Sequence, residues 1–454
     1  MFDTLLVANR GEIARRVIRT ARRMGLRTVA VHSDVDANLP FVTEADVAVA
    51  IGAAAPAESY RNVEAILRAA RETGAQAIHP GYGFLSENAD FARAVVDAGL
   101  IWVGPSADVI EQMGDKINAR NLLQDAGVPV AAGTREPVTD AAAARSAADG
   151  IGFPVMLKAS AGGGGMGMSV AHGPDEVAEQ FERIAAFAER MFGDASVLLE
   201  RFLPVARHVE VQILGLPADG DRPARVVALG ERDCSVQRRN QKVAEETPSP
   251  GVGPDLRARM LAAAVRAGEA VGYVGAGTVE CLVDEAAQDF VFLEMNTRLQ
   301  VEHPITEAVT GLDLVEQQLL IAGGQPITFD PDGVTVSGHA IELRINAEDP
   351  KRFLPGPGAV RRWDEPSGAG VRVDSGYAAG TTVTPSYDSL MAKLIVHGAD
   401  RDEALGRARE AVAGFAIEGP KCNLPFFAEL LEHPEFVSGH YDTGIVGRMR
   451  ASGR

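Results

Sequence analysis

Two spacings of hydrophobic residues alternate along the chain, and together they predict a protein that mixes strands with helices. The apolar run Leu5–Ala8 has the length of a buried strand, and Ile13, Val17 and Ile18 follow it with helical spacing. A second apolar run, Thr28–Val31, comes next. A strand, a helix and a strand in this order predict a right-handed parallel unit.

The same alternation continues, with helices expected at 63–73 and 89–98 and strands at 77–79 and 101–103. The first turn lacks the Gly-x-Gly-x-x-Gly fingerprint, so the topology is Rossmann-like without indicating a nicotinamide cofactor. The segment His79–Asn88 follows a strand, which is where ligands bind in open α/β sheets. A tight structural turn is the alternative interpretation of this segment.

A glycine-rich segment follows the predicted strand 154–159. Lys158 stands at its start, and Gly163, Gly164 and Gly165 lie at its centre. The backbone N–H groups of such a loop can approach a phosphate closely because glycine has no Cβ. The ending of a P-loop is missing, and a flexible hairpin tip is the alternative. We nevertheless expect this segment to contact phosphate.

Further periodic segments fill the rest of the chain. We expect helices at 116–126, 255–271, 312–322 and, as the last one, 402–413, and strands at 196–203, 208–214, 225–229, 338–349, 371–373, 381–383 and 394–396. The strand 196–203 carries Glu200 and Leu203 at its end. An acid beside an apolar residue suits the wall of an adenine pocket, although many strands end in charge.

Two more strands, 278–283 and 290–293, are joined by a polar turn and predict a hairpin. Strand side chains alternate, so Glu294 and Asn296 face the same side. The hairpin brings Glu280 close to Glu294, and neighbouring carboxylates repel unless a proton or a cation lies between them. Carboxylate and amide oxygens suit Mg²⁺. We prefer a metal site, with a solvated edge strand or a structural cross-strand pair as alternatives.

The run after this hairpin is rich in polar groups. If the backbone stays extended, Arg298, Gln300 and Glu302 share one face. Upstream, the segment 238–242 contains two arginines and Lys242, which form a basic patch in an acidic chain. A nucleic-acid-binding arm would be longer and richer in lysine and aromatic residues, so a pocket for small anions fits this patch better.

The composition narrows the class of protein. The chain has 454 residues, enough for several domains, and a net charge of −18, which argues against a general nucleic-acid binder. No apolar run reaches the ~20 residues that span a bilayer, and the first residues lack a signal-peptide pattern. Cys234, Cys281 and Cys422 are far apart and odd in number. We therefore expect a cytoplasmic protein with reduced cysteines.

Long motifs in a fixed order resemble the biotin carboxylase component of biotin-dependent carboxylases, within the ATP-grasp superfamily. They extend over nearly the whole chain. The motifs are Ala8–Ala14, His79–Asn88, Met113–Lys116, Lys158–Met168, Glu231–Lys242, Glu294–Pro304, Arg344–Pro350 and Tyr387–Ser389.

The resemblance implies an α/β fold with three domains. A Rossmann-like domain is expected at 1–114, and a β-rich biotin carboxylase domain at 335–445. Between them, an ATP-grasp domain is expected at 115–325, with a mobile glycine-loop lid at about 131–203. The resemblance further implies a homodimer.

The implied partners are a biotin carboxyl carrier protein and a carboxyltransferase. The chain has no Met-Lys-Met signature of biotin attachment, so biotin is expected as a substrate on the carrier. The chain is then either a separate subunit or a fragment of a longer polypeptide. Neither nucleic acid nor a membrane is expected as a partner.

The family's motifs also imply the role of each site residue. ATP would contact Lys116, Lys158, Gly163, Gly164 and Gly165 with its phosphates, Glu200 and Leu203 with its adenine, and His208 and Gln237 with its ribose. Magnesium or manganese would be held by Glu280, Glu294 and Asn296. Bicarbonate would lie against Lys242, Arg298, Gln300 and the Val301 backbone, with Glu302 as the base and Arg344 against the biotin ring.

The implied reaction has two stages. Glu302 removes the proton of bicarbonate, whose oxygen then attacks the γ-phosphate of ATP. The resulting carboxyphosphate releases carbon dioxide beside biotin, and the liberated phosphate acts as base on biotin N1. Carboxyphosphate hydrolyses in water, which is a physical reason for a closing lid.

Two positions depart from the family's pattern. Met166 follows the four glycines where many relatives have a basic residue, and Asn240 stands where several have histidine. Asparagine can form hydrogen bonds but carries no charge at neutral pH. The Asn240 variant occurs among acyl-CoA carboxylases and favours that group.

Two other functions share part of these motifs. Another ATP-grasp ligase, joining a carboxylate to an amine, would share the nucleotide and metal residues, but the bicarbonate residues with Arg344 argue against it. A silent ATP-binding regulatory protein would explain Met166 and Asn240. The presence of Lys116 and Glu302 argues against that alternative.

Overall fold

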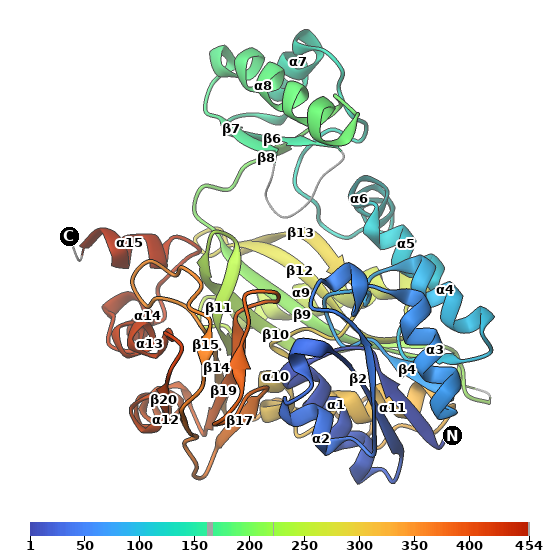
Figure 1. Cartoon of the computed structure of the whole chain (residues 1–454). Helices are drawn as coiled ribbons and strands as arrows, with labels where there is room; N and C mark the ends of the chain where they lie inside the picture. Colours follow the sequence, from blue (N-terminus) through green and yellow to red (C-terminus); the bar gives the residue numbers. More distant parts are fainter. Residues whose placement is uncertain (161–166, 221, 453–454) are drawn as a thin grey trace.

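The computed structural model describes residues 1–160, 167–220 and 222–452 (Figure 1). A five-stranded sheet in the order β3-β2-β1-β4-β5 organises the N-terminal part, and all its neighbouring strands are parallel. The strands are β1 (Thr4–Val7), β2 (Arg27–Ser33), β3 (Val47–Gly52), β4 (Ala77–His79) and β5 (Ile101–Trp102). The helices are α1 (Gly11–Arg23), α2 (Pro40–Glu44), α3 (Val63–Thr73), α4 (Ala89–Asp97) and α5 (Ala107–Gly114). The predicted parallel unit of β1, α1 and β2 is confirmed.

A small unit, formed by described residues on both sides of the glycine-rich segment, projects from the rest of the molecule (Figure 1). A three-stranded antiparallel sheet in the order β7-β6-β8 forms one layer of it. Its elements are α7 (Ala141–Ile151), β6 (Val155–Ala159), β7 (Met168–Ala171), α8 (Pro174–Phe192) and β8 (Val197–Arg201). The helices pack on the sheet around a separate hydrophobic cluster that includes Leu157, Ile184 and Leu199.

An eight-stranded antiparallel sheet forms the centre of the molecule, in the order β13-β12-β9-β10-β11-β14-β19-β17. The strands are β9 (Arg207–Leu216), β10 (Arg225–Arg238), β11 (Gln241–Thr247), β12 (Gly275–Asp284), β13 (Asp289–Asn296), β14 (His339–Asn346), β17 (Val371–Ser375) and β19 (Leu390–Gly398). The helices around it are α6 (Lys116–Asp125), α9 (Pro254–Ala270), α10 (His303–Thr310) and α11 (Leu314–Ala322).

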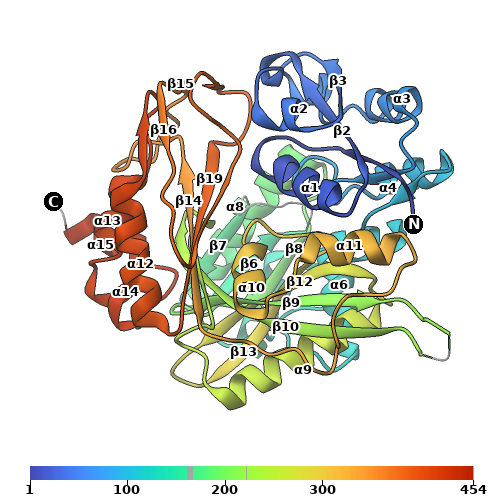
Figure 2. The same cartoon turned by 90° about the horizontal axis from the view of Figure 1, so that it is seen from below.

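The C-terminal part adds short strands and a group of helices. The strands are β15 (Gly358–Ala359), β16 (Arg362–Asp364), β18 (Thr382–Val383) and β20 (Ala416–Glu418), and the helices are α12 (Arg401–Gly414), α13 (Leu424–Leu430), α14 (Pro434–Ser438) and α15 (Ile445–Ser452). Figure 2 shows β14 and β19 between these helices and the N-terminal part. The prediction that the helix at 402–413 is the last one was wrong, because three helices follow it.

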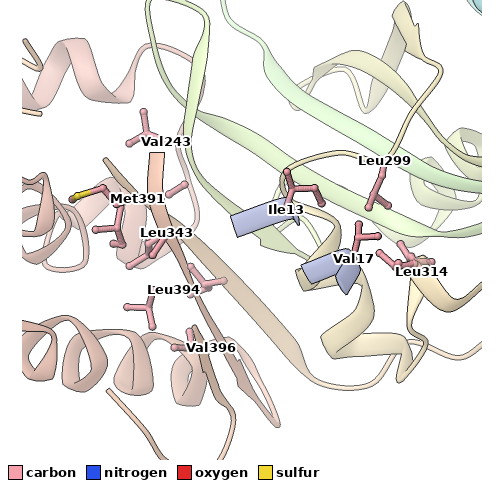
Figure 3. Close-up of a cluster of buried hydrophobic side chains, with 14 of the residues drawn as sticks. Ile13, Val17, Val243, Leu299, Leu314, Leu343, Met391, Leu394 and Val396 are labelled. Carbon is pink, nitrogen blue, oxygen red and sulfur yellow. The ribbon is translucent and has the colours of Figure 1, made fainter. Parts of the chain in front are cut away.

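One continuous hydrophobic core joins the N-terminal part to the central sheet (Figure 3). Ile13 and Val17 of α1 belong to the same buried cluster as Leu314 of α11 and Leu394 of β19. Burying apolar area is the main favourable term in folding, so these parts stabilise each other. The small projecting unit has its own cluster instead.

The predicted strand 225–229 is only the beginning of a much longer strand. β10 continues to Arg238, turns through Arg239 and Asn240, and returns as β11, which the sequence pattern did not reveal. Arg239 and Asn240 have φ values of +49° and +64°. Asparagine tolerates this left-handed region better than most residues, which gives Asn240 a conformational role in the hairpin turn.

Candidate active site

The β12–β13 hairpin places the two predicted carboxylates side by side. Its register sets Glu280 opposite Glu294 and Thr278 opposite Asn296, so the predicted hairpin is confirmed. Glu280 and Asn296 are buried, while the Glu294 side chain is 36% exposed. Lys116 Nζ lies 2.9 Å from Glu294 Oε2, so a cationic group already lies against this carboxylate.

Glu280 accepts hydrogen bonds from several predicted site residues at once. Its Oε1 receives Asn296 Nδ2 at 2.9 Å and Gln300 Nε2 at 3.0 Å. Its Oε2 lies 2.8 Å from His208 Nε2. Burial would raise the pKa of Glu280, but Lys242 and His208 outweigh this effect and hold the pKa well below its usual range. Glu280 is therefore an ionised carboxylate.

Lys242 lies among three buried carboxylates. Its Nζ donates to Glu210 Oε2 at 2.5 Å, to Glu280 Oε1 at 2.9 Å and to Glu302 Oε1 at 2.7 Å. Burial opposes the charge of Lys242, but the carboxylates raise its pKa well above the usual value. The ammonium group thus remains charged at the centre of the site, as an anion-binding role requires.

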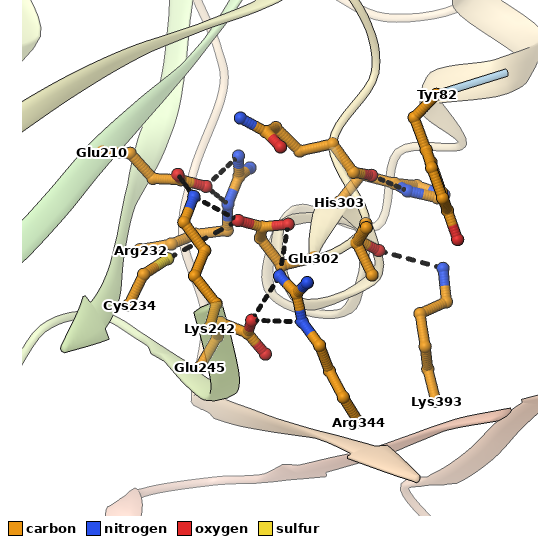
Figure 4. Close-up of polar contacts among 12 residues, drawn as sticks. Tyr82, Glu210, Arg232, Cys234, Lys242, Glu245, Glu302, His303, Arg344 and Lys393 are labelled. Carbon is orange, nitrogen blue, oxygen red and sulfur yellow. Dashed lines mark hydrogen bonds and ion pairs between the residues drawn. The ribbon is translucent and has the colours of Figure 1, made fainter. Parts of the chain in front are cut away.

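Glu302 lies between two cationic side chains (Figure 4). Lys242 binds its Oε1, and Arg344 Nη2 lies 3.0 Å from its Oε2. Glu302 is completely buried. Burial alone would raise its pKa, yet Lys242 and Arg344 hold the pKa well below the usual range. A buried, ionised carboxylate is a group that can accept a proton from a substrate.

Arg298 connects the segment from Asn296 to Gln300 to the N-terminal part. Its Nη2 donates to Asn296 Oδ1 at 2.8 Å, and its Nη1 donates to Gln300 Oε1 at 2.9 Å. Its Nε lies 2.9 Å from Glu87 Oε2. The condition for Arg298, Gln300 and Glu302 to share one strand face, an extended backbone, is not met. β13 ends at Asn296, and Glu302 occupies the N-cap position of helix α10.

The residues predicted to bind the nucleotide include two separate ion pairs. Lys158 on β6 pairs with Glu200 on the neighbouring strand β8, within the small projecting unit. Lys116 begins helix α6, whose N-cap Asp115 accepts the N–H groups of the following residues, and reaches Glu294 in the main body. Both lysines are thus paired with carboxylates.

The other residues predicted for the site lie on different elements and have different contacts. His208 and Gln237 contact each other, with 2.8 Å between His208 Nδ1 and Gln237 Nε2. Leu203 follows β8 and is half-buried. The Val301 carbonyl accepts a hydrogen bond from Lys393 at 2.9 Å. Gly163, Gly164 and Gly165 lie outside the described residues, as does Met166.

Several buried residues of this site were not recognised from the sequence. Arg232 is completely buried and donates to Glu210 Oε1 at 2.6 Å and to Thr306 Oγ1, on α10, at 2.9 Å. Glu245 accepts a hydrogen bond from Arg344 Nε at 2.6 Å. One of these residues could have been found from the sequence. Side chains alternate along a strand, so Glu210 on β9 shares a face with the predicted site residue His208.

The segment after β4 forms a rigid turn beside these residues. Asn9 Nδ2 donates to the carbonyls of Pro80 and Tyr82, each at 2.7 Å. Gly81 has φ +63°, and a Cβ built there would approach Asn9 Nδ2 to 2.8 Å. Glycine is therefore required here, and the turn carries Tyr82 towards the site. Tyr82 in turn donates to Glu12 on α1.

The oxygen donors suit a divalent metal ion. Glu280 and Glu294 present carboxylates from adjacent strands, with the Asn296 amide beside them. Hard cations such as Mg²⁺ prefer oxygen ligands of this kind. Lys116 pairs with Glu294 and Lys242 pairs with Glu280, so both carboxylates already lie against a cationic group.

Family models match almost the entire chain. The model of the biotin carboxylase N-terminal domain matches residues 1–110. The model of the ATP-binding domain of the carbamoyl-phosphate synthase L chain matches residues 115–329, and that of the biotin carboxylase C-terminal domain matches residues 342–448. The biotin carboxylase of Halalkalibacterium halodurans is 48% identical over 446 residues, which cover 98% of this chain and 97% of the relative.

The chain belongs to the biotin carboxylase family. One of the pyruvate carboxylase subunits of Methanothermobacter thermautotrophicus is also similar, with 46% identity over 99% of this chain and 90% of the relative. Members of the biotin carboxylase family therefore occur in carboxylases named for different substrates.

Solved structures of the family have the same fold. The biotin carboxylase–βγ-ATP complex from Campylobacter jejuni matches with a TM-score of 0.93 and 40% identity, covering 99% of both chains. The biotin carboxylase domain dimer of Hydrogenobacter thermophilus 2-oxoglutarate carboxylase, in complex with MgADP, ADP and bicarbonate, matches with a TM-score of 0.91. That match has 41% identity and covers 99% of this chain and 98% of the other.

Helices able to cross a bilayer were sought in residues 1–160, 167–220 and 222–452. None of the helices in these ranges combines the necessary length with sufficiently apolar character.

Proposed function

We propose that this protein catalyses the ATP-dependent carboxylation of biotin by bicarbonate, giving carboxybiotin, ADP and phosphate. The observation that carries the proposal is the arrangement of Lys242, Glu302 and Arg344. Glu302 is an ionised, completely buried carboxylate that lies between two cations. Lys242 suits the anionic substrate bicarbonate, and Arg344 suits the negative charge that develops on biotin. Membership of the biotin carboxylase family supports the same reaction.

Bicarbonate is activated by losing its proton to Glu302. We place the anion against Lys242, Arg298, Gln300 and the backbone of Val301. An anion bound there competes with Glu302 for the positive charge of Lys242. The proton affinity of Glu302 therefore rises when the substrate is present, which makes this carboxylate a better base than in the ligand-free site.

Phosphoryl transfer then follows from position and charge. The deprotonated bicarbonate oxygen attacks the γ-phosphorus of ATP, the bond to the β,γ-bridging oxygen breaks, and ADP leaves. Lys116 and Lys158 bind the phosphates, together with Gly163, Gly164 and Gly165. Glu280, Glu294 and Asn296 would hold Mg²⁺ or Mn²⁺, which supplies charge neutralisation at the phosphates.

We assign recognition of the nucleoside to residues of the proposed lid and to residues of the main sheet. Glu200 and Leu203 lie at the end of the lid strand β8 and just after it, and are proposed to contact the adenine. His208 and Gln237, which contact each other on adjacent strands of the main sheet, are proposed to contact the ribose. ATP would thus connect the lid to the main body.

Carboxyl transfer to biotin uses Arg344. Carboxyphosphate breaks at its C–O bond into carbon dioxide and phosphate, and the phosphate takes the proton of biotin N1. The nitrogen then forms a bond to the carbon of carbon dioxide. Arg344 stabilises the negative charge on the biotin ring during this step, and Glu245 holds the guanidinium group in place.

We propose domain boundaries at 1–114, 115–325 and 335–445, with the lid at about 131–203. The separate hydrophobic cluster of the lid supports its independence. We further propose that a cytoplasmic homodimer works with a biotin carboxyl carrier protein and a carboxyltransferase. The dimer named for the Hydrogenobacter thermophilus domain supports the dimeric state, and the mass in solution tests it. Asn240 favours an acyl-CoA as the final acceptor.

Steady-state release of ADP tests the proposed reaction. With Mg²⁺, ATP and bicarbonate, free biotin should stimulate ADP release, and omission of bicarbonate should abolish the stimulation. Glu302→Gln should lower the stimulated rate by roughly 100-fold to 10,000-fold, the usual value of a positioned base. Glu316→Gln makes the same chemical change on α11 and should leave the rate unchanged. An ATP-binding protein with no response to biotin, free or carrier-bound, would contradict the proposal.

A further inference from the structure

A basic surface lies beside the proposed active site. Its exposed residues are Arg239, Lys351, Arg352 and Leu354, which we name the basic rim. The rim borders a hollow of about 400 Å³. The walls of the hollow include Gln237, Arg238, Phe353, Thr443 and Arg450.

The segment that carries most of the basic rim is held in a fixed shape. Asp349 Oδ1 accepts the backbone N–H groups of Lys351, at 3.1 Å, and of Arg352, at 2.9 Å. The Asp349 carbonyl accepts the N–H of Phe353 at 2.7 Å. Phe353 is buried, and the Arg238 guanidinium lies 4.8 Å from the centre of its ring. The side chains on either side of Phe353 are consequently turned outward.

The charges of the basic rim are not neutralised within the described chain. Arg239, Lys351 and Arg352 form no ion pair with a described carboxylate, although the chain as a whole has a net charge of −18. Leu354 beside them is 54% exposed. Exposed cations around an exposed apolar side chain are typical of a surface that binds an acidic protein partner.

The basic rim is connected directly to the strands that carry the catalytic cations. Arg239 lies in the turn between β10 and β11, a few residues before Lys242. Lys351 and Arg352 follow the end of β14, the strand that carries Arg344. Arg238 joins the two segments by donating to the Phe353 carbonyl at 2.9 Å. A protein bound to the rim is therefore held next to the mouth of the site.

We propose that the basic rim docks the biotin-carrying domain through an acidic face of that domain. The inference rests on the proposed function, because it concerns how carrier-bound biotin reaches Arg344 and Glu302. Opposite charges on two partners accelerate their encounter and set their orientation, so the rim raises the effective affinity for the carrier without taking part in the chemistry.

Charge reversal separates docking from catalysis. Lys351→Glu combined with Arg352→Glu should raise the KM for a biotinylated carrier domain by about tenfold, because repulsion replaces attraction. The rate with saturating free biotin and the KM for ATP should not change. The increase in KM with added salt should be smaller in the variant than in the unmodified protein, since exposed charges are screened.

A matched control makes the same change of net charge elsewhere. Arg61→Glu combined with Arg71→Glu alters two exposed arginines of the N-terminal part and should leave the carrier KM unchanged. A second check uses carrier domains in which the exposed acids near the biotinyl-lysine are replaced by amides. With these carriers, the rim variant and the unmodified protein should have the same KM for the carrier.

Several results would overturn the docking proposal. An unchanged carrier KM in the rim variant would exclude docking there. A raised KM for ATP would assign the surface to the nucleotide, and a changed mass in solution would assign it to a contact between copies of this chain. Failure of the unmodified protein to respond to free biotin would instead contradict the proposed function, and the docking proposal with it.

Discussion

At the scale of single residues, two adjacent glutamates show how strongly the tertiary surroundings set side-chain chemistry. Glu245 and Glu246 lie on β11 and point to opposite faces of the sheet. Burial raises the pKa of Glu245 to about 7, even though Arg344 opposes the shift. Glu246 is equally buried, but His339 and Arg401 outweigh this effect and lower its pKa to about 2.

Replacing Glu246 should cost stability in a pH-dependent way. Its folded pKa lies below the unfolded value, so its contribution is present above about pH 4.5 and is lost as the pH falls towards 2. Glu246→Gln should lower the free energy of unfolding by about 3 kcal/mol at pH 7, and the deficit should shrink below pH 4.5. Urea unfolding between pH 7 and pH 3.5 measures both values.

Glu245→Gln provides the matched control, because the pKa of Glu245 is shifted in the opposite direction from that of Glu246. The folded pKa of Glu245 is raised, so wild-type stability from this group falls as the pH rises from about 4.5 to 7. The variant should therefore gain stability relative to the unmodified protein over that interval. A deficit of Glu246→Gln that does not depend on pH would contradict the assigned ion pairs.

At the scale of secondary-structure elements, β19 connects the C-terminal part to the segment that contains Val301. Lys393 is completely buried; its Nζ lies 3.0 Å from Glu12 Oε2 on α1 and donates to the Val301 carbonyl at 2.9 Å. One side chain thus fixes a strand, a helix and the backbone that we assign to the bicarbonate pocket (Figure 4).

Lys393→Met should loosen this connection. We expect the KM for bicarbonate to rise by roughly tenfold, because the Val301 backbone is no longer held in position. Loss of one partner of a buried ion pair should also lower the free energy of unfolding by about 3 kcal/mol. Bicarbonate titrations of ADP release and urea unfolding measure the two effects.

A variant that keeps the positive charge distinguishes loss of Val301 positioning from general destabilisation of the fold. Lys393→Arg should recover part of the bicarbonate affinity, whereas Lys421→Met, at an exposed lysine, should leave it unchanged. The KM for ATP should be similar in all three variants. A folded Lys393→Met protein with an unaltered bicarbonate KM would exclude the positioning role.

The sequence predicted a secondary-structure element well where its hydrophobic residues followed either helical or strand spacing throughout. Helix α3 and strand β4 lie at the predicted residues, and the β12–β13 hairpin forms. β11 was missed because its polar residues Glu245 and Glu246 are buried only by pairing with side chains from distant elements. No local pattern identifies a strand of that kind.

At the scale of the whole molecule, the proposed lid and the main body carry different parts of the proposed ATP site. Lys158 lies on the proposed lid, and Lys116 and Glu294 lie on the main body (Figure 1). Each lysine is paired within its own unit. We propose that a single triphosphate engages both lysines and that the two units approach each other when it binds.

We therefore expect ATP to close the molecule. A non-hydrolysable ATP analogue with Mg²⁺ should reduce the radius of gyration measured by small-angle X-ray scattering, because lid closure makes the molecule more compact. Lys158→Met should weaken the change, since the lid loses a phosphate contact. A radius that stays constant at saturating nucleotide would contradict closure.

The sequence by itself determined the kinds of chemical group and their local order. The carboxylates Glu280 and Glu294, the lysines Lys116 and Lys242 and the proposed base Glu302 stand in recognisable motifs, because strand and helix periodicity and family motifs depend on nearby residues. The family and the class of reaction followed from these motifs.

Only the tertiary structure decided which groups meet. Arg344 contacts Glu302 because β14 lies next to β11 in the central sheet, and Lys393 reaches Val301 because β19 lies beside β14. The order of strands depends on contacts between residues far apart in the chain, and buried charges take their pKa values from those contacts. The physical reason is that burial and long-range pairing, unlike periodicity, exist only once the chain has folded.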